Sequence, residues 1–576
     1  MARKASAPPY DAVSTKRLMD DTEALARWVR LSGTPEELEA FRYTQKQLRA
    51  AGCKTQLLMH DAFISLPGPA SLALVQSGSS RAVPCVTHSF AASTAGLEAA
   101  AVYAATPADL PATQAAGRIA VLDGLASPAG VQAGQAAGAA GLVFLNRDPY
   151  VHEMIVSTVW GSPPADAMDR MPRIPVVSVA GRDADAVRTA VPGGQTRLRI
   201  TASVDTGWRK TPLLVADLPG TVEDTFVMFT GHLDSWHRGA MDNGTANATM
   251  LEIARAMAKV RRYRGVRFAF WSGHSHGRYS GSTWYADHYW HDLDAHCIAH
   301  VNVDSTGGKG SIINRHAYAM PETQGVADAV VRSLAGGRFE GQRIGRMGDQ
   351  SFLGIGVPSL LMDISEQSGD SPEASRDFSV FSGGNTGGLG WWWHTTEDTP
   401  DKIDPALLER DSKIYLGIVH AFATSPVAPL DYTATATMWL KQLQGLRKGA
   451  AAGALDVRPA VAEAARLVRA TQGLARRARA LARSSYRRAV RQVNATLMAI
   501  SRALIPIDYT ERGRFDHDPA VTHREPPHLA ALKALSTAKG DAAKHLAVRA
   551  ARDLNAIRHA LATASAAAES ATRRRA

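Results

Sequence analysis

The feature that most constrains the fold is a series of short apolar runs between residues 206 and 428, separated by helical stretches. The runs are TFVMFT, GVRFAFW, CIAHVNV and VPSLLM, and the segment GTANATMLEIARAMAKV lies between the first two. Apolar runs that do not alternate with polar residues are typical of strands buried on both faces. The pattern therefore predicts an α/β domain with a mixed, mostly parallel sheet flanked by helices, whose ligands bind beyond the carboxyl ends of the strands.

Polar side chains follow these predicted strand ends. His232 comes directly after the first run, and Asp234 is two residues later, where a carboxylate can hold the second nitrogen of a metal-binding imidazole. Asp242 stands just before a predicted helix, so it is a candidate metal ligand or an ordinary N-cap. Asp304 closes CIAHVNV, and His394 lies in the loop WWWHTTEDT. Imidazoles and carboxylates from separate loops suit a metal pair, in which one carboxylate can give an oxygen to each ion.

Two helices are predicted ahead of this domain, in LMDDTEALARWVRL and PEELEAFRYTQKQLRAAG. The second has clear boundaries: Thr34 can cap it, Pro35 suits its first position, and Gly52 can end it. We assign residues 12–65 and 206–428 to one domain.

Residues 66–205 have a different residue pattern, in which short β-rich runs alternate with Gly, Pro and Ala. GRIAVLDG is followed by the small-residue helical pattern GVQAGQAAGAAG, then by GLVFLNRD and IPVVSVAG. This order predicts a separate β-rich domain inserted into the first, and it resembles the protease-associated domain.

Beyond Pro429 the chain is rich in Ala, Leu and Arg, which predicts an all-α region over 429–576. Helical runs are expected near 435–448, 457–504 and 526–570, with a break over 505–524 around two prolines. Residues 431–576 hold 26 Lys and Arg against 11 Asp and Glu, so the chain's formal charge of +11 is concentrated here. A solvated helical surface is favoured over a nucleic-acid site, because no aromatic residues alternate with the arginines.

Features of the whole chain bear on its surroundings. No apolar run approaches the eighteen residues of a membrane span, and the first residues lack the apolar core of a signal peptide. The three cysteines, Cys53, Cys85 and Cys297, fit neither a disulfide framework nor a zinc knuckle. We expect a cytoplasmic protein with no membrane partner.

Six segments over residues 225–402 resemble, in order, the motifs of the zinc exopeptidases of family M28: GHLDSW, DNGTA, RFAFWSG, GSTWYAD, VNVDS and HTTEDT. The resemblance implies the zinc-exopeptidase fold and a peptide or acylated amino-acid substrate. It implies two zinc ions held by His232, Asp242, Asp304 and His394, with Asp242 bridging. The branch that includes glutamate carboxypeptidase and transferrin receptor also has an inserted protease-associated domain and a helical dimerisation domain, so the resemblance implies a homodimer.

The chain departs from the family at one important place. The family has two adjacent glutamates after the strand RFAFW, a general base and then a metal ligand, where this chain has His274 and Ser275. His274 is then the candidate general base, and His276 is a candidate ligand that could complete the coordination of one ion. Asp349, in GDQSF, resembles an acidic loop motif of the family and is assigned a supporting role behind the ligands, as is Asp234.

Two functions remain open at this point. The first is a zinc-dependent hydrolase that removes a terminal residue from a peptide or splits a related amide. The second is a catalytically inactive binding or scaffold protein that keeps the peptidase fold, because both glutamates are replaced. The three tryptophans Trp391, Trp392 and Trp393 either line a substrate pocket or pack the loop that carries His394.

Overall fold

The structure is a computed structural model. It describes residues 7–76, 79–192, 195–360, 363–381, 386–448, 455–482, 486–521 and 523–573.

The chain begins with the helices α1 (Thr15–Leu25) and α2 (Pro35–Ala50). The predicted start of α2 is confirmed, because the Thr34 side chain accepts from the backbone N–H of Glu37 and Pro35 occupies the first turn. The predicted extent of the first helix is wrong at its end: α1 stops at Leu25. Arg30, in the following loop, is fully buried and donates to the carbonyl of Leu25 and to carbonyls of a distant loop. These bonds hold the chain outside a helix.

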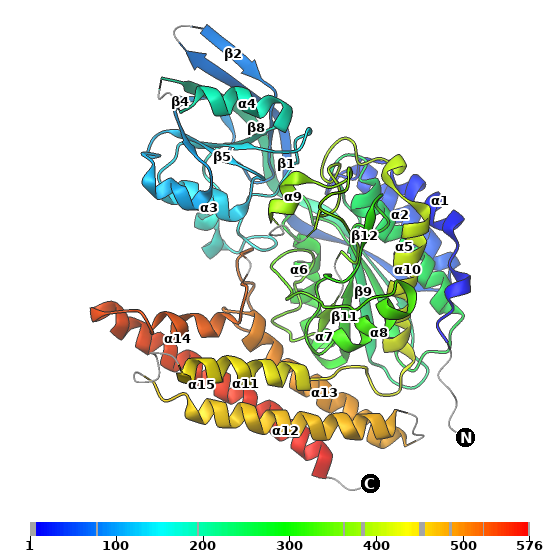
Figure 1. Ribbon diagram of the computed structural model, residues 1–576. Coiled ribbons are helices and arrows are strands. Elements are labelled where there is room, and N and C mark those ends of the chain that lie inside the picture. Colours follow the sequence, from blue (N-terminus) through cyan, green and yellow to red (C-terminus); the bar gives the residue numbers. More distant parts are fainter. Residues whose placement is uncertain are drawn as a thin grey trace.

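A large sheet continues from one end of the α/β region to the other (Figure 1). Its strands, from one edge to the other, are β13 (Ser359–Leu360), β11 (Cys297–Asn302), β9 (Phe226–His232), β10 (Gly265–Trp271), β8 (Arg197–Leu218), β4 (Thr94–Ala104), β5 (Ile119–Asp123), β6 (Gly141–Leu145), β7 (Val176–Val179) and β3 (Val86–Thr87). The neighbours β13, β11, β9 and β10 are parallel, and β10 pairs antiparallel with β8. The predicted mixed, mostly parallel sheet is confirmed.

Helices cover both faces of the strands around β9. Val227 and Phe229 point into a core shared with α5 (Ala246–Ala258) and α10 (Pro405–Thr424), whereas Met228 points into a second core under α6 (Ser280–His288) and α7 (Trp290–His296). Successive side chains of a strand point to opposite faces, so β9 is buried on both sides. Three shorter elements complete this region: α8 (Gln324–Leu334), α9 (Arg376–Phe381) and the two-stranded sheet of β12 (Ser311–Ile313) and β14 (Glu366–Gln367).

Two long antiparallel strands, β1 (Lys54–Gln76) and β8, run side by side between the two sheet regions. The expected domain boundaries near 65 and 205 therefore fall inside continuous strands. Beyond them β1 pairs with β2 (Ser79–Val83), and the parallel strands β4 to β7 form their own cores with α3 (Pro128–Ala136) and α4 (Gly181–Ala190). The expected strands and the small-residue helix of this segment are present.

The C-terminal region is helical, with α11 (Thr433–Lys448), α12 (Arg458–Leu481), α13 (Arg487–Tyr509), α14 (Ala530–Ala534) and α15 (Gly540–Arg573) packed beside the α/β region (Figure 1). The expected break at residue 505 is wrong, because α13 continues through Pro506 to Tyr509. Ile505 and Tyr509 pack against Met320 and Leu353 of the α/β region, and this burial holds the last turn although proline removes one backbone donor.

Short single-turn elements connect these parts: the 3₁₀ turns Tyr10–Ala12, Pro107–Ala112, Ala165–Arg170, Pro400–Lys402 and Pro527–Leu529, and the wider turn Ala240–Thr245. Among the described residues, no helix is both long and apolar enough to cross a membrane.

Candidate metal centre

Four residues singled out in the sequence meet at the carboxyl ends of the central strands. His232 is the last residue of β9, and Asp304 follows β11 by two residues. Asp242 lies in the turn Ala240–Thr245 that leads into α5, and His394 comes from the loop before α10. All four side chains are at least nine-tenths buried. The parallel sheet therefore brings together residues that are up to 162 positions apart, as the strand order requires.

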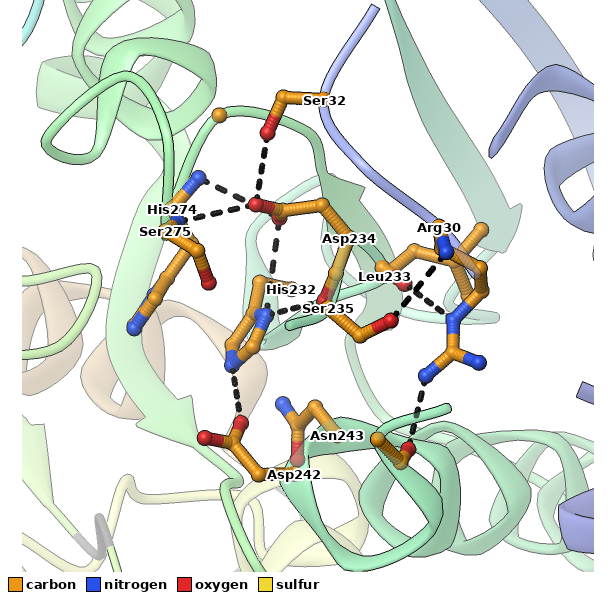
Figure 2. Close-up of polar contacts among 12 residues, drawn as sticks. Arg30, Ser32, His232, Leu233, Asp234, Ser235, Asp242, Asn243, His274 and Ser275 are labelled. Atoms are coloured by element: carbon orange, nitrogen blue, oxygen red, sulfur yellow. Dashed lines mark hydrogen bonds and ion pairs between the residues drawn. The ribbon is translucent and has the colours of Figure 1, made fainter. Parts of the chain in front are cut away.

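The carboxylate of Asp242 stands between two imidazoles. Its Oδ1 lies 3.0 Å from Nε2 of His232, and its Oδ2 lies 3.0 Å from Nε2 of His394. Figure 2 shows His232 directed at Asp242 from the end of its strand. One oxygen per imidazole is the arrangement in which a single carboxylate can serve two cations.

The second nitrogen of each imidazole is held by a backbone carbonyl. Nδ1 of His232 lies 2.9 Å from the carbonyl oxygen of Asp234, and Nδ1 of His394 lies 2.7 Å from that of Glu153. A carbonyl only accepts, so each Nδ1 donates, and the neutral ring then directs a lone pair from Nε2 at the Asp242 carboxylate. Two acceptors at 3.0 Å need a cation or a proton between them. Among the described residues, Nε2 of His232 and Oδ1 of Asp242 are both buried without a hydrogen-bond partner, so the donor set fits zinc.

The electrostatics of the centre favour a positive charge beside Asp242. Burial lowers the pKa of His232, but Asp304, Asp234 and Asp242 together raise that pKa well above its usual value. Burial acts to raise the pKa of Asp242, yet the adjacent imidazoles of His232 and His394 hold it well below its usual range. Removing a cation from this carboxylate would leave a buried charge whose solvation is lost.

A third group of contacts joins His274 to the His232 side. Its ring stacks on the His232 ring at 3.7 Å between centroids, and Nδ1 lies 2.9 Å from Oδ2 of Asp349. Asp304 Oδ2 lies 3.5 Å from His232 Nε2. His232, His274 and Asp304 each offer a ligand atom, and these atoms lie within 4.8 Å of one another. Asp349 thus lies next to His274, and its supporting role stays a prediction.

Asp234 is close to His232, but its carboxylate has a different task from the one expected. Its backbone carbonyl takes the short bond from the imidazole, whereas its Oδ1 is 3.6 Å from the ring. The carboxylate instead accepts from the backbone N–H groups of His274 and Ser275 and from the hydroxyl of Ser32 (Figure 2). Asp234 therefore fixes the backbone of the altered pair. The reason is the turn after β9, which brings the carbonyl closer to the ring than the side chain.

Ser275 and His276 lie beside the centre. Among the described residues, neither side chain contacts His394 in the way that His274 contacts His232. The hydroxyl of Ser275 is buried and has no hydrogen-bond partner in the part of the chain that the structure describes. Nδ1 of His276 lies 3.1 Å from the hydroxyl of Ser32, its ring packs 4.3 Å from Trp236, and burial lowers its pKa to about 4. Within the described ranges, His276 belongs to no set of three residues whose ligand atoms gather closely enough for one ion. Its role as a ligand stays a prediction.

Several residues that support the centre were not identified from the sequence. The carboxylate of Asp398 accepts from the backbone N–H groups of Met241 and Asp242 at 2.8 and 3.0 Å, and burial raises its pKa to about 7. Arg30 donates to the carbonyls of Leu233 and Gly239, and so binds the two turns that carry the ligands. Asp398 belongs to the motif HTTEDT, which was a usable signal, but no local pattern marks Arg30.

The three tryptophans mainly pack the loop of His394. Trp392 is buried and its Nε1 donates to the sulfur of Met241, and the Trp393 ring stacks on His394 at 3.5 Å. Trp391 stacks on Tyr150, which lies between β6 and β7, with the ring centroids 5.1 Å apart. These contacts favour the packing alternative.

Comparison with known proteins agrees with this geometry. Residues 214–419 match the profile of Peptidase family M28. The "Probable glutamate carboxypeptidase VP8" of Zea mays is 24% identical over 352 residues, which cover 49% of this chain and 49% of the maize protein. "Aminopeptidase NAALADL1" of Mus musculus is 28% identical over 125 residues, covering 20% of this chain and 16% of the mouse protein. The chain thus spans about half the length, or less, of these curated relatives.

Solved structures support the fold. A "Peptidase M28 precursor" from Shewanella amazonensis is 20% identical with a TM-score of 0.57, covering 73% of this chain and 95% of its own. A zinc aminopeptidase from Bacillus subtilis is 19% identical with a TM-score of 0.54, covering 73% of this chain and 97% of its own. The matching profile covers the central strands β9 to β11 and the metal centre, so this region of the chain, residues 214–419, is similar to peptidase family M28.

Proposed function

We propose that this protein is a zinc-dependent hydrolase that cleaves a terminal peptide bond or a related amide. The observation that carries the proposal is the Asp242 carboxylate, which presents one oxygen to Nε2 of His232 and the other to Nε2 of His394. The names of the relatives, an aminopeptidase and a probable glutamate carboxypeptidase, support a peptide or acylated amino-acid substrate.

The metal-holding residues in this proposal are His232, Asp242, Asp304 and His394, with Asp242 shared by two zinc ions. Zinc, when bound, supplies Lewis acidity for a scissile carbonyl and lowers the pKa of water. The chain supplies the remainder: Asp234 and Glu153 fix the imidazole tautomers through their carbonyls, and Asp398 holds the backbone of Asp242.

His274 is the proposed general base. Its Nδ1 faces the carboxylate of Asp349, which only accepts when ionised, so Nδ1 donates and Nε2 keeps the lone pair that can take a proton. The stack on His232 and the edge of Tyr279, 4.8 Å away, leave the ring little freedom to rotate. A positioned imidazole of this kind can replace a glutamate base, because it accepts a proton near neutral pH.

The alternative function is a catalytically inactive binding or scaffold protein. It is favoured by one specific observation: the hydroxyl of Ser275, where the family has a glutamate ligand, is buried and makes no hydrogen bond to any described residue. Serine supplies no carboxylate at this position, so the centre has one carboxylate ligand fewer than the family pattern implies.

The test combines metal content with turnover on the full chain. Purified protein is analysed for bound zinc and assayed against a panel of aminoacyl and acyl-amino-acid amides, with His274→Ala as the matched variant. The proposal expects bound zinc, hydrolysis of a panel member, and loss of that hydrolysis in the variant with zinc retained. Zinc without hydrolysis would favour the inactive alternative, and neither zinc nor hydrolysis would reject the metal centre as well.

The assembly and surroundings are further parts of the proposal. We place the helical region 429–576 at a homodimer interface, and we propose a protease-associated insert and a cytoplasmic location, with no nucleic-acid partner. Sedimentation of the full chain at micromolar concentration tests the dimer, and a monomer at that concentration contradicts it. Cell fractionation tests the location.

A further inference from the structure

A loop of the inserted segment, residues 146–153, lies directly against the loop that carries His394. The two loops hydrogen-bond to each other in both directions at this point. The backbone N–H of Glu153 donates to the carbonyl of His394 at 3.1 Å, and Nδ1 of His394 donates to the carbonyl of Glu153 at 2.7 Å. The acceptor that sets the tautomer of His394 therefore comes from the insert, some 240 residues earlier in the chain.

His152, the preceding residue, connects the same two loops through its side chain. Its Nδ1 lies 2.5 Å from the carbonyl oxygen of Trp393, and its Nε2 lies 3.0 Å from Oδ2 of Asp148. The side chain is completely buried. Both ring nitrogens thus contact oxygen acceptors, one on the loop of His394 and one on the insert itself.

The other end of the loop is anchored to α9. The carboxylate of Asp148 accepts from the backbone N–H of Arg376 at 2.8 Å and from the hydroxyl of Ser375. In return Asp377 accepts from the backbone N–H groups of Arg147 and Asp148, at 2.6 and 3.0 Å. Asp148, His152 and Asp377 are close enough to hold an ion, but their oxygens already accept from protein donors. The cluster is therefore built to dock the loop.

We propose that His152 is a positioning residue for the metal centre, and that docking of the insert loop and metal binding at His394 stabilise each other. The inference rests on the proposed function, since it assumes that His394 holds a metal. Residues that orient a metal-binding imidazole commonly change metal affinity by about 10-fold to 100-fold when altered. Because coupling between two binding events is reciprocal, the metal must favour the docked loop as much as the docked loop favours the metal.

The first test compares His152→Gln with wild type in the full chain. We expect zinc affinity, measured by competition with a chromogenic chelator, to fall by about tenfold, and the visible absorption of the Co²⁺-substituted protein to change as the ligand moves. Asp377→Asn should also lower zinc affinity, but by a smaller factor. The matched control is Tyr103→Phe, which removes a 2.7 Å bond to Asp123 inside the insert and should leave affinity and spectrum unchanged.

The second test needs no variant. Hydrogen exchange of wild-type peptides that cover residues 147–153 is compared in metal-free and zinc-loaded protein, and slower exchange with zinc is expected. If wild type binds zinc but the exchange is indifferent to it, or if folded His152→Gln matches wild type in affinity and Co²⁺ spectrum, the positioning role is overturned. Failure of wild type to bind zinc would instead overturn the proposed function, and this inference with it.

Discussion

The two imidazoles that face Asp242 present the same atom to the same carboxylate, but different kinds of structure hold them. His232 ends β9, which lies between β10 and β11 and is buried along its whole length. Its tautomer is set by Asp234, two residues away. His394 lies in a loop, has a left-handed φ of 58°, and takes its acceptor from Glu153 in the inserted segment.

The difference shows that the His232 half of the centre is held by residues nearby in the sequence, whereas the His394 half is held by residues far away in the sequence. The strand half needs only the sheet, and it also has Asp304 and His274 at hand. The loop half depends on Glu153, which lies in the segment 66–205 far from His394 along the chain. We therefore expect the His232 half to bind metal more tightly and the His394 half to respond more to changes elsewhere.

The largest effect is expected for Asp242→Ala, because this change removes the group common to both halves. Metal affinity should fall by more than about 100-fold, beyond the loss caused by altering a supporting residue. Elemental analysis after dialysis against a weak chelator measures the effect. Asp304→Ala and His394→Ala, which each affect one half, are the comparison. Equal retention of zinc in the three variants would contradict a shared carboxylate.

The two halves are separated by comparing His232→Ala with His394→Ala. Because His232 and Asp304 of the strand half remain in His394→Ala, that variant should keep about one ion per chain, whereas His232→Ala should lose most bound zinc. Zinc titration by calorimetry gives the stoichiometry. If His394→Ala bound less zinc per chain than His232→Ala, the loop half would be the stronger site.

A change in turnover without a change in metal is expected at His274. His274→Ala should lower kcat by about 10²-fold to 10⁴-fold, the usual contribution of a general base. Asp349→Asn should have a smaller effect, because the imidazole would keep its place but lose the carboxylate behind Nδ1. Bound zinc is measured on the same samples. If His274→Ala loses zinc in proportion to activity, His274 is a ligand of the strand half.

The smallest effect on the centre is expected for Glu322→Gln, which tests stability away from both halves. Burial raises the pKa of Glu322 to about 7, and the hydroxyl of Thr435 in α11 donates to its carboxylate at 2.7 Å. Folding therefore favours the protonated acid, so wild-type stability should fall as pH rises from about 4.5 to about 7 and then level off.

Glutamine cannot ionise, so Glu322→Gln should remove this pH dependence. Above pH 7 the variant should be the more stable by about 1.4 kcal/mol for each unit of pKa shift, while zinc affinity stays as in wild type. Denaturant unfolding at pH 5 and pH 8 measures the difference. A wild-type stability that rises across this window would show that the carboxyl is ionised in the folded protein.

The sequence allows much of the strand half to be predicted and little of what supports the loop half. His232 and Asp304 follow apolar runs, and an apolar run that ends in a ligand-type residue is a local signal. The pairing of Glu153 with His394 joins segments about 240 residues apart, and no periodicity encodes such a contact. The wrong prediction of a helix break at Pro506 has the same origin. Packing of Ile505 and Tyr509 against Met320 and Leu353 outweighs the local preference of proline.

The measurement that tests the central claim most directly is anomalous diffraction at the zinc edge from crystals of the full chain grown with zinc. The account predicts an anomalous peak beside Asp242, at a zinc to nitrogen distance of about 2.0–2.1 Å from Nε2 of His232, and no such peak in Asp242→Ala crystals. Ordered His232, Asp242 and His394 side chains with no peak between them would contradict the account.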